Sequence, residues 1–248
     1  MFNQSIESLK QSAFILCVTF LIFSCKKEQP LNFKEIAIEQ HDAAKIEVVY
    51  PQFDNNSSVA SKINTSIESS IAKNIAFFDD DTLHLSLKDA VKEFDNRFMT
   101  FKKDFQDTTS DWVATVNSEV VYSSAEVITV AVDSYTFTGG AHGNSIITLL
   151  NFNPETGDLY NNESLFKINT DFKSLVKGYL TDEIKAKTSD DSENYFFGED
   201  FKLPENIGFN DEGVIFLYNS YEIAAYAQGI TEFTIPYGRI SSYLKINP

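Results

Sequence analysis

The sequence is short of cysteine, histidine and basic residues, and each shortage excludes a class of function. It holds two cysteines and three histidines among 248 residues. The histidines are scattered, so that no pair has the spacing of a zinc site and no free cysteine completes one; they are His41, His84 and His142. A P-loop, a dinucleotide-binding fingerprint and a G-x-S-x-G motif are also missing. We therefore expect neither a metal nor a cofactor.

Basic residues are outnumbered by acidic ones. Lysine and arginine total 20 against 36 for aspartate and glutamate, which gives a formal charge of −16. A nucleic-acid-binding surface needs clustered Lys and Arg, and so does electrostatic docking on anionic lipid. The charge balance therefore argues against nucleic acid and against an anionic lipid surface as partners.

Glycine and proline are few as well, with ten and six residues, whereas Phe and Tyr number 22 and 11. So little glycine and proline excludes collagen-like and low-complexity architectures. So many aromatic side chains exclude a solvated, disordered chain. We expect a folded protein with a sizeable core.

The longest hydrophobic run lies near the N-terminus. Residues 13–23 (AFILCVTFLIF) carry no charge, and the run is too short for a membrane-spanning helix but typical of the core of a signal peptide. The following Ser24-Cys25 resembles a bacterial lipobox, in which the cysteine becomes the first mature residue and carries the lipid. An uncleaved N-terminal anchor and an ordinary signal peptide are the other interpretations.

We therefore expect a signal peptide over 1–24 and, over 25–32, the lipidated Cys25 and a tether. Cleavage removes Cys17, so no disulfide is expected in the mature chain. The protein would then be anchored by lipid alone in the bacterial cell envelope. We place it at the outer membrane facing the periplasm, with the cell surface as the alternative.

Hydrophobic periodicity predicts an α+β fold, with antiparallel sheets and about three to four helices packed on one face. Apolar residues recur at helical spacing over 58–77, 86–105 and 171–187. Segments rich in Val, Ile, Thr and Tyr predict strands over 33–39, 45–50, 112–123, 126–135, 145–152, 213–218 and 232–236.

The rest of the chain completes this picture. Residues 189–200 are acidic and polar and are expected to form a surface loop, and residues 239–244 a short terminal helix. Because the helices cluster instead of alternating with strands, α+β is favoured over a parallel, doubly wound sheet. We expect an N-terminal α+β subdomain over 33–137 and a C-terminal one over 138–248.

The most unusual local string is T-G-G-A-H-G-N at 138–144. Its three glycines allow positive φ and close backbone approach. His142 within it is a candidate general base or ligand contact. Since no catalytic partner stands at motif spacing, the favoured interpretation is a turn in which His142 bonds to a neighbouring carbonyl.

That string resembles part of one bacterial family, and so do N-F-N at 151–153 with T-G at 156–157, Y-E-I-A-A-Y-A-Q-G at 221–229 and I-P-Y at 235–237. The family is the extracytoplasmic domain shared by RsiV-type lysozyme-sensing anti-sigma factors and PdaC-type peptidoglycan deacetylases. The resemblance covers about residues 33–244. A sigma-binding segment with its membrane span, and a following deacetylase domain, are not found, so we expect the shared domain alone on a lipid anchor.

The resemblance implies a non-enzymatic binding lipoprotein that recognises a lysozyme-like protein or peptidoglycan. The negative charge fits a cationic partner such as lysozyme, although charge also serves plain solubility. Candidate contacts are aromatic, since such rings suit a protein hot spot or stacking on sugar, unless they are buried in the core: Tyr195, Phe196, Tyr221 and Tyr226. The alternative is a hydrolase of cell-wall glycan or peptide, with His142 as base and Glu222 as its partner.

Overall fold

The computed structural model describes residues 32–248 apart from 55–56, 77–85, 108–109 and 188–194. Residues 31–248 form one compact unit. The expected signal peptide, Cys25 and His84 lie outside the described residues. Within the described ranges, no helix is long and apolar enough to cross a membrane.

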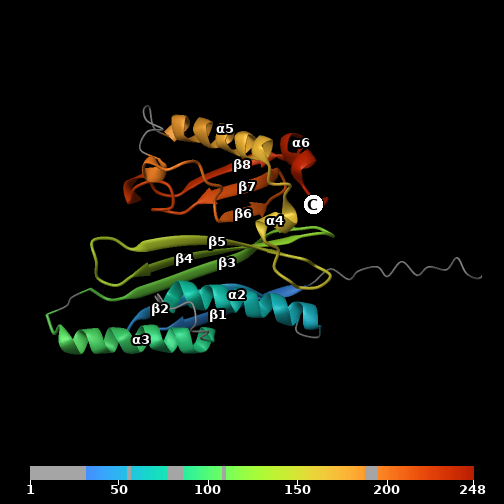
Figure 1. The fold of residues 1–248 in the computed structure, drawn as a ribbon. Coiled ribbons are helices and arrows are strands. Elements are labelled where there is room, and N and C mark those ends of the chain that lie inside the picture. The colour runs from blue at the N-terminus through green and yellow to red at the C-terminus, as the bar shows by residue number, and fades with distance from the viewer. Residues whose placement is uncertain (1–31, 55–56, 77–85, 108–109, 188–194) are drawn as a thin grey trace, which may run out of the picture. The chain divides into compact units, whose positions relative to one another are not determined.

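Five strands form the first sheet, in the order β1-β2-β3-β4-β5 (Figure 1). Neighbours are antiparallel except β2 and β3, which are parallel. A parallel pair needs a long crossover, and helices α2 (Ser58–Ala76) and α3 (Leu87–Asp104) lie in that connection. The strands are β1 (Phe33–Gln40), β2 (Lys45–Phe53), β3 (Val113–Ser123), β4 (Ile128–Phe137) and β5 (Asn144–Phe152).

The second sheet is antiparallel and consists of β6 (Asn206–Phe209), β7 (Gly213–Tyr218) and β8 (Thr231–Pro236). Helix α5 (Thr170–Lys187) packs on β8, and the short α6 (Tyr237–Ile240) packs on β7 and β8. Strand β6 packs against β5 of the first sheet. Figure 1 therefore shows the two sheets stacked between α2 and α3 on one side and α5 and α6 on the other.

The apolar row of α2 explains why this helix covers the first sheet. Ile63, Ile67, Ile71 and Ile75 have no exposed surface and join the sheet residues in one core cluster. Burial of each such side chain stabilises the fold by about 1.5–3 kcal/mol. Helix α3 begins at an N-cap, since the Ser86 side chain accepts a hydrogen bond from the backbone N–H of Asp89.

The predicted α+β class is confirmed, with each sheet covered by helices on one face. The expected helices at 58–77 and 86–105 match α2 and α3 to within a residue or two at each end. The expected helix at 239–244 begins earlier, as α6, and ends in a 3₁₀ turn over Ser241–Tyr243. Strand β6 and helix α4 (Asn162–Leu165) were not predicted. The expected subdomain boundary at 137/138 stays a prediction.

The described part of the expected loop at 189–200 contains a 3₁₀ turn, Phe196–Gly198. Tyr195, predicted as a contact residue, is only 5% exposed and belongs to the core of the second sheet. Burial removes the apolar ring of Tyr195 from water, which stabilises the fold. The ring is therefore part of the core and is not available as a contact surface. The neighbouring Phe196 is half-buried, and its ring lies against Phe201 and Tyr218.

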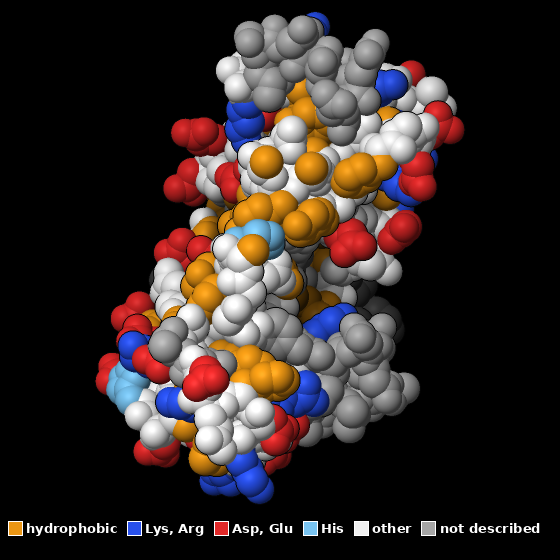
Figure 2. All heavy atoms as spheres, turned by 90° about the vertical axis from the view of Figure 1, so that its left-hand side faces the viewer, with side chains coloured by type: hydrophobic (Ala, Val, Ile, Leu, Met, Phe, Trp, Pro, Cys, Tyr) orange, Lys and Arg blue, Asp and Glu red, His pale blue; other side chains and the backbone are white. Residues whose placement is uncertain are grey.

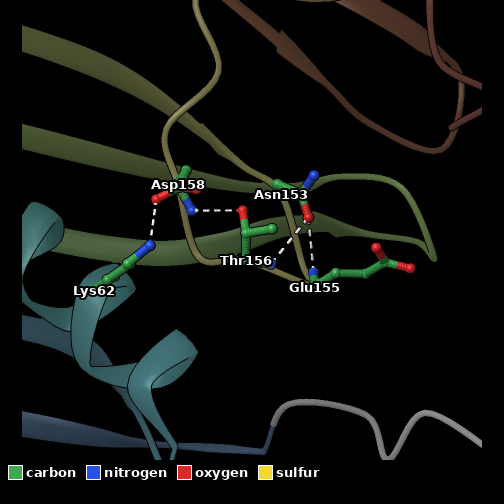
Figure 3. Close-up of polar contacts among 5 residues, drawn as sticks. All are labelled: Lys62, Asn153, Glu155, Thr156 and Asp158. Carbon is green, nitrogen blue, oxygen red and sulfur yellow. Dashed lines mark hydrogen bonds and ion pairs between the residues drawn. The ribbon is translucent and has the colours of Figure 1, made fainter.

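The turn after β5 holds the chain against α2 (Figure 3). The Asn153 side chain accepts hydrogen bonds from the backbone N–H groups of Glu155 and Thr156, at 2.8 and 3.1 Å. Asp158 pairs with Lys62 of α2 at 2.6 Å. Gly157 between them has φ of +73°, and a Cβ there would lie 2.5 Å from the carbonyl oxygen of Val59. Only glycine fits this contact.

We expect Gly157→Ala to lower the free energy of unfolding by at least about 2 kcal/mol, because it adds left-handed strain and a clash with helix backbone. The matched control is Gly178→Ala in α5, where an added Cβ meets nothing within 4 Å. That change should raise stability by up to about 1 kcal/mol through helix propensity. Urea unfolding of both variants checks this pair. Equal effects would contradict the contact at Val59.

Tyr50 links β2 to α2, since its hydroxyl donates to Glu68 at 3.2 Å. Burial, and then the carboxylate of Glu68, raise the pKa of Tyr50 to about 12. The folded state therefore favours the neutral phenol, and the stability this provides is complete below pH 10 and is lost as the pH rises toward 12.

We expect the free energy of unfolding to fall less steeply between pH 10 and 12 in Tyr50→Phe than in the unsubstituted protein, because Phe keeps the buried ring but does not titrate. Urea unfolding at several pH values measures both slopes. Other buried tyrosines contribute equally to both proteins, so identical slopes would show that Tyr50 ionises as it does in the unfolded chain.

Candidate binding surface

Three asparagine side chains join the open edge of β5 to the second sheet. Asn219 accepts from the backbone N–H of Ile147 and donates to its carbonyl, both at 2.9 Å. Asn206 accepts from the N–H of Leu149 at 3.0 Å. Asn151 of β5 donates to the carbonyl of Ile207 at 2.6 Å. These bonds bring the β4–β5 hairpin next to the loop between β7 and β8, and both loops lie at the left end of Figure 1.

Three aromatic rings contact one another where these two loops adjoin, and a fourth lies beside Gly143 next to them; we call the four the aromatic cluster: His142, Tyr221 and Tyr226, with Tyr135 beside Gly143. The imidazole of His142 stacks on the Tyr226 ring, with centroids 3.7 Å apart and planes inclined by 16°. The Tyr221 ring lies 5.6 Å from that of Tyr226. A Cβ on Gly143 would lie 2.3 Å from the Tyr135 ring, so this ring occupies the space that a side chain at Gly143 would take.

The cluster is open to solvent. Tyr221 is 56% exposed and Tyr135 40% exposed. His142 is also exposed, and Tyr226 is half-buried beneath it. Figure 2 shows a histidine bordered by hydrophobic side chains midway along this face. The cluster therefore offers aromatic surface to a ligand.

Backbone hydrogen bonds hold the loop that carries Tyr221. The two carboxylate oxygens of Glu222 accept from the N–H groups of Glu205 and Asn219, at 2.9 and 2.8 Å. Burial raises the pKa of the Glu222 carboxyl, and these two N–H groups oppose that rise. Glu222 thus acts as a structural acceptor in this loop.

His142 bonds to backbone as well. Its Nδ1 lies 2.9 Å from the carbonyl oxygen of Gly143, which also accepts from the Tyr226 hydroxyl at 3.0 Å. Because a carbonyl only accepts, Nδ1 must carry the proton, and Nε2 of the neutral ring is an acceptor. Among the described residues no hydrogen bond or ion pair joins His142 to Glu222, and no group of three or more His, Cys, Asp and Glu is arranged to hold a metal.

The face of the first sheet that points away from α2 and α3 carries exposed carboxylates, and we call it the acidic sheet face: Glu35, Glu39, Glu47, Glu119 and Asp133. Alternation places them there, since Ile46, Val48 and Val132 point into the helix-covered core. Burial raises the pKa of the Asp133 carboxyl. Lys45, on the same face by alternation, pairs with Asp111 at 3.1 Å.

The two surfaces adjoin. Strand register places Glu39 beside Glu47, Glu47 beside Thr115, and Thr115 beside Tyr135. Tyr135 is therefore the fourth member of a row that crosses all five strands and ends at Ser145 of β5. The acidic sheet face ends at the aromatic cluster.

The structure brings together three of the residues singled out from the sequence, Tyr221, Tyr226 and His142. It separates Tyr195, which is buried, and Phe196, which is half-buried on the neighbouring loop. Sequence reasoning missed Tyr135. Its alternation in β4, and Gly143 two residues before its cross-strand partner Ser145, were the signals that mark a ring lying diagonally across the hairpin.

The molecule is thus a two-sheet α+β protein with an exposed aromatic and acidic surface. Residues 38–145 match the family model described as deacetylase PdaC. Residues 163–238 match the model described as a protein of unknown function, DUF3298. The predicted resemblance to the RsiV/PdaC-like domain pair is confirmed, because the two models match successive stretches of the chain.

Solved structures have the same fold. A DUF3298 family member from Bacteroides fragilis NCTC 9343 has a TM-score of 0.60 and 20% identity, over 88% of this chain and 95% of that chain. A DUF3298 family protein from Pseudomonas aeruginosa PAO1 has a TM-score of 0.60 and 17% identity over the same shares. No curated protein matches the chain.

Proposed function

We propose that the protein is a non-enzymatic binding lipoprotein of the bacterial cell envelope that recognises a cationic, lysozyme-like protein. Lipid on Cys25 would tether it, at the outer membrane facing the periplasm. The observation that carries the proposal is the acidic sheet face, whose five carboxylates are all exposed on the side of the first sheet that α2 and α3 do not cover.

Charge supports this class of partner in two ways. The protein carries a formal charge of −16, so a cationic protein is attracted over a long range. The acidic sheet face concentrates part of that charge on one side of the first sheet, and Lys45 on that face is already paired with Asp111. Such complementarity raises the association rate and fixes which face of the partner docks.

The hydrolase alternative has less support in the geometry. The hydrogen bonds of His142 and Glu222 go to backbone groups, as is usual for residues that hold loops in place. Peptidoglycan is the other partner implied by the resemblance. A polymer without a strong positive charge gains little from the acidic sheet face, so we favour the protein partner.

We expect the chain from residue 26 onward to bind immobilised lysozyme at about 10 mM salt and to lose most of that affinity near 1 M salt, where screening acts within a few ångströms. The variant Glu39→Gln/Glu47→Gln/Glu119→Gln should weaken binding at low salt by about tenfold or more. Surface plasmon resonance measures both effects.

The matched control is Glu155→Gln/Glu163→Gln/Asp182→Asn, which removes three exposed carboxylates outside the acidic sheet face and changes the net charge equally. It should change the affinity by no more than about twofold. If both variants weaken binding equally, the interaction depends on net charge alone and the acidic sheet face is not the binding surface. If the protein does not bind lysozyme at low salt but does bind insoluble peptidoglycan, the proposed partner is wrong and peptidoglycan is the ligand.

A further inference from the structure

Tyr221 combines two costs that a structural residue does not need. Its φ is +70°, a backbone conformation that bulky L residues rarely adopt. Its ring is 56% exposed, so burial does not repay the strain. Strain of this kind persists where function retains it.

The strained residue belongs to a prearranged group of rings. Glu222 and Asn219 fix the turn around it by hydrogen bonds to backbone. The carbonyl of Gly143 receives both the His142 Nδ1–H and the Tyr226 hydroxyl, so these two rings stack in one fixed position. A ligand that meets the aromatic cluster therefore finds its rings already ordered, which lowers the entropic cost of binding.

The surroundings select the chemistry of that ligand. The cluster is an open surface, because the side chains of Tyr135, His142 and Tyr221 are exposed to solvent. Flat rings with polar tips suit a ligand that has an apolar face and hydroxyls along its edge. Because the Nδ1–H of His142 bonds to the Gly143 carbonyl, Nε2 is the ring nitrogen through which His142 would bind a ligand hydroxyl.

Charge narrows the choice further. Asp133 lies two residues from Tyr135 on β4 and on the same side of the sheet, within the acidic sheet face. A phosphate, sulfate or uronic acid would be repelled there. An acyl chain gains nothing from the hydroxyl and imidazole tips. A sugar ring without charge meets each condition.

We propose that the aromatic cluster is a binding site for a neutral oligosaccharide, with Tyr221 as the stacking platform and His142 and Tyr226 as the adjoining wall. This site is distinct from the acidic sheet face, which it borders at Tyr135. The inference does not depend on the lysozyme-like partner, because the two sites use different residues and different forces.

The test uses Tyr221→Gly in the chain from residue 26 onward. Glycine removes the ring and also the backbone strain, so the variant should melt at the same temperature as the unsubstituted protein or higher. Its affinity for a neutral oligosaccharide should nevertheless fall about tenfold or more. Isothermal titration with chitotetraose and, in parallel, maltotetraose measures the affinity.

Phe105→Ala is the control, since Phe105 is a 59% exposed aromatic residue outside the cluster. It should leave oligosaccharide binding unchanged. Binding of either oligosaccharide that is lost in Tyr221→Gly and kept in Phe105→Ala supports the site. Failure of both oligosaccharides to bind, or equal binding by Tyr221→Gly, overturns it.

Lysozyme binding by the same variants separates this inference from the proposed function. Tyr221→Gly should keep its affinity for immobilised lysozyme, which depends on the acidic sheet face. The opposite result has two parts: Tyr221→Gly loses lysozyme binding, and the unsubstituted protein binds no oligosaccharide. Together they would show that the aromatic cluster belongs to the protein interface, and they would overturn the saccharide site.

Discussion

The rest of the structure depends on how the open edge of β5 is closed. A sheet edge presents unpaired N–H and C=O groups, which attract a further strand and are costly to bury unpaired. Here asparagine side chains take the place of that strand. The amide of Asn219 makes the two hydrogen bonds to Ile147 that a neighbouring strand would make, and Asn206 continues the pattern at Leu149.

This closure joins sheets that do not share a continuous ladder. Asn151 extends the link to Ile207, and its Oδ1 accepts from the hydroxyl of Thr129, whose Oγ1 lies 3.3 Å from the backbone N of Phe209. The network is buried, so each group must find its partner in one arrangement. Because that arrangement is unique, the hairpin at 138–143 and the loop at 219–229 come together, and the aromatic cluster is a consequence.

Part of this was predictable from the sequence, and the reasons are local. The four isoleucines of α2 recur at helical spacing, and Ser86 caps the start of α3. Both signals come from residues inside or next to the helix that they predict. Strand β6 gives no such signal, because its four residues are all buried and show no alternation. Its place beside β5 is set by Asn206, whose partner lies 57 residues away. Helical and strand periodicity describe neighbouring residues only, so they cannot predict a contact between residues so far apart in the sequence.

The two surfaces illustrate the same limit. Tyr221, Tyr226 and His142 were recognisable one at a time, yet their contact depends on the junction between the sheets. Tyr135 and the acidic sheet face became visible only once strand order was known, since Glu39, Glu47 and Glu119 come from three strands whose adjacency includes a parallel pair. Tyr195 looked like a loop aromatic but serves the core.

Amide hydrogen exchange of β5, followed residue by residue by NMR, tests the junction most directly. The account predicts that the Ile147 and Leu149 amides, which face the asparagine side chains, exchange at least about a hundredfold more slowly than the amides on the open side of β1. Exchange of these two amides as fast as on the open side of β1 would contradict it, because the edge would then be unpaired and the two loops would not be held together.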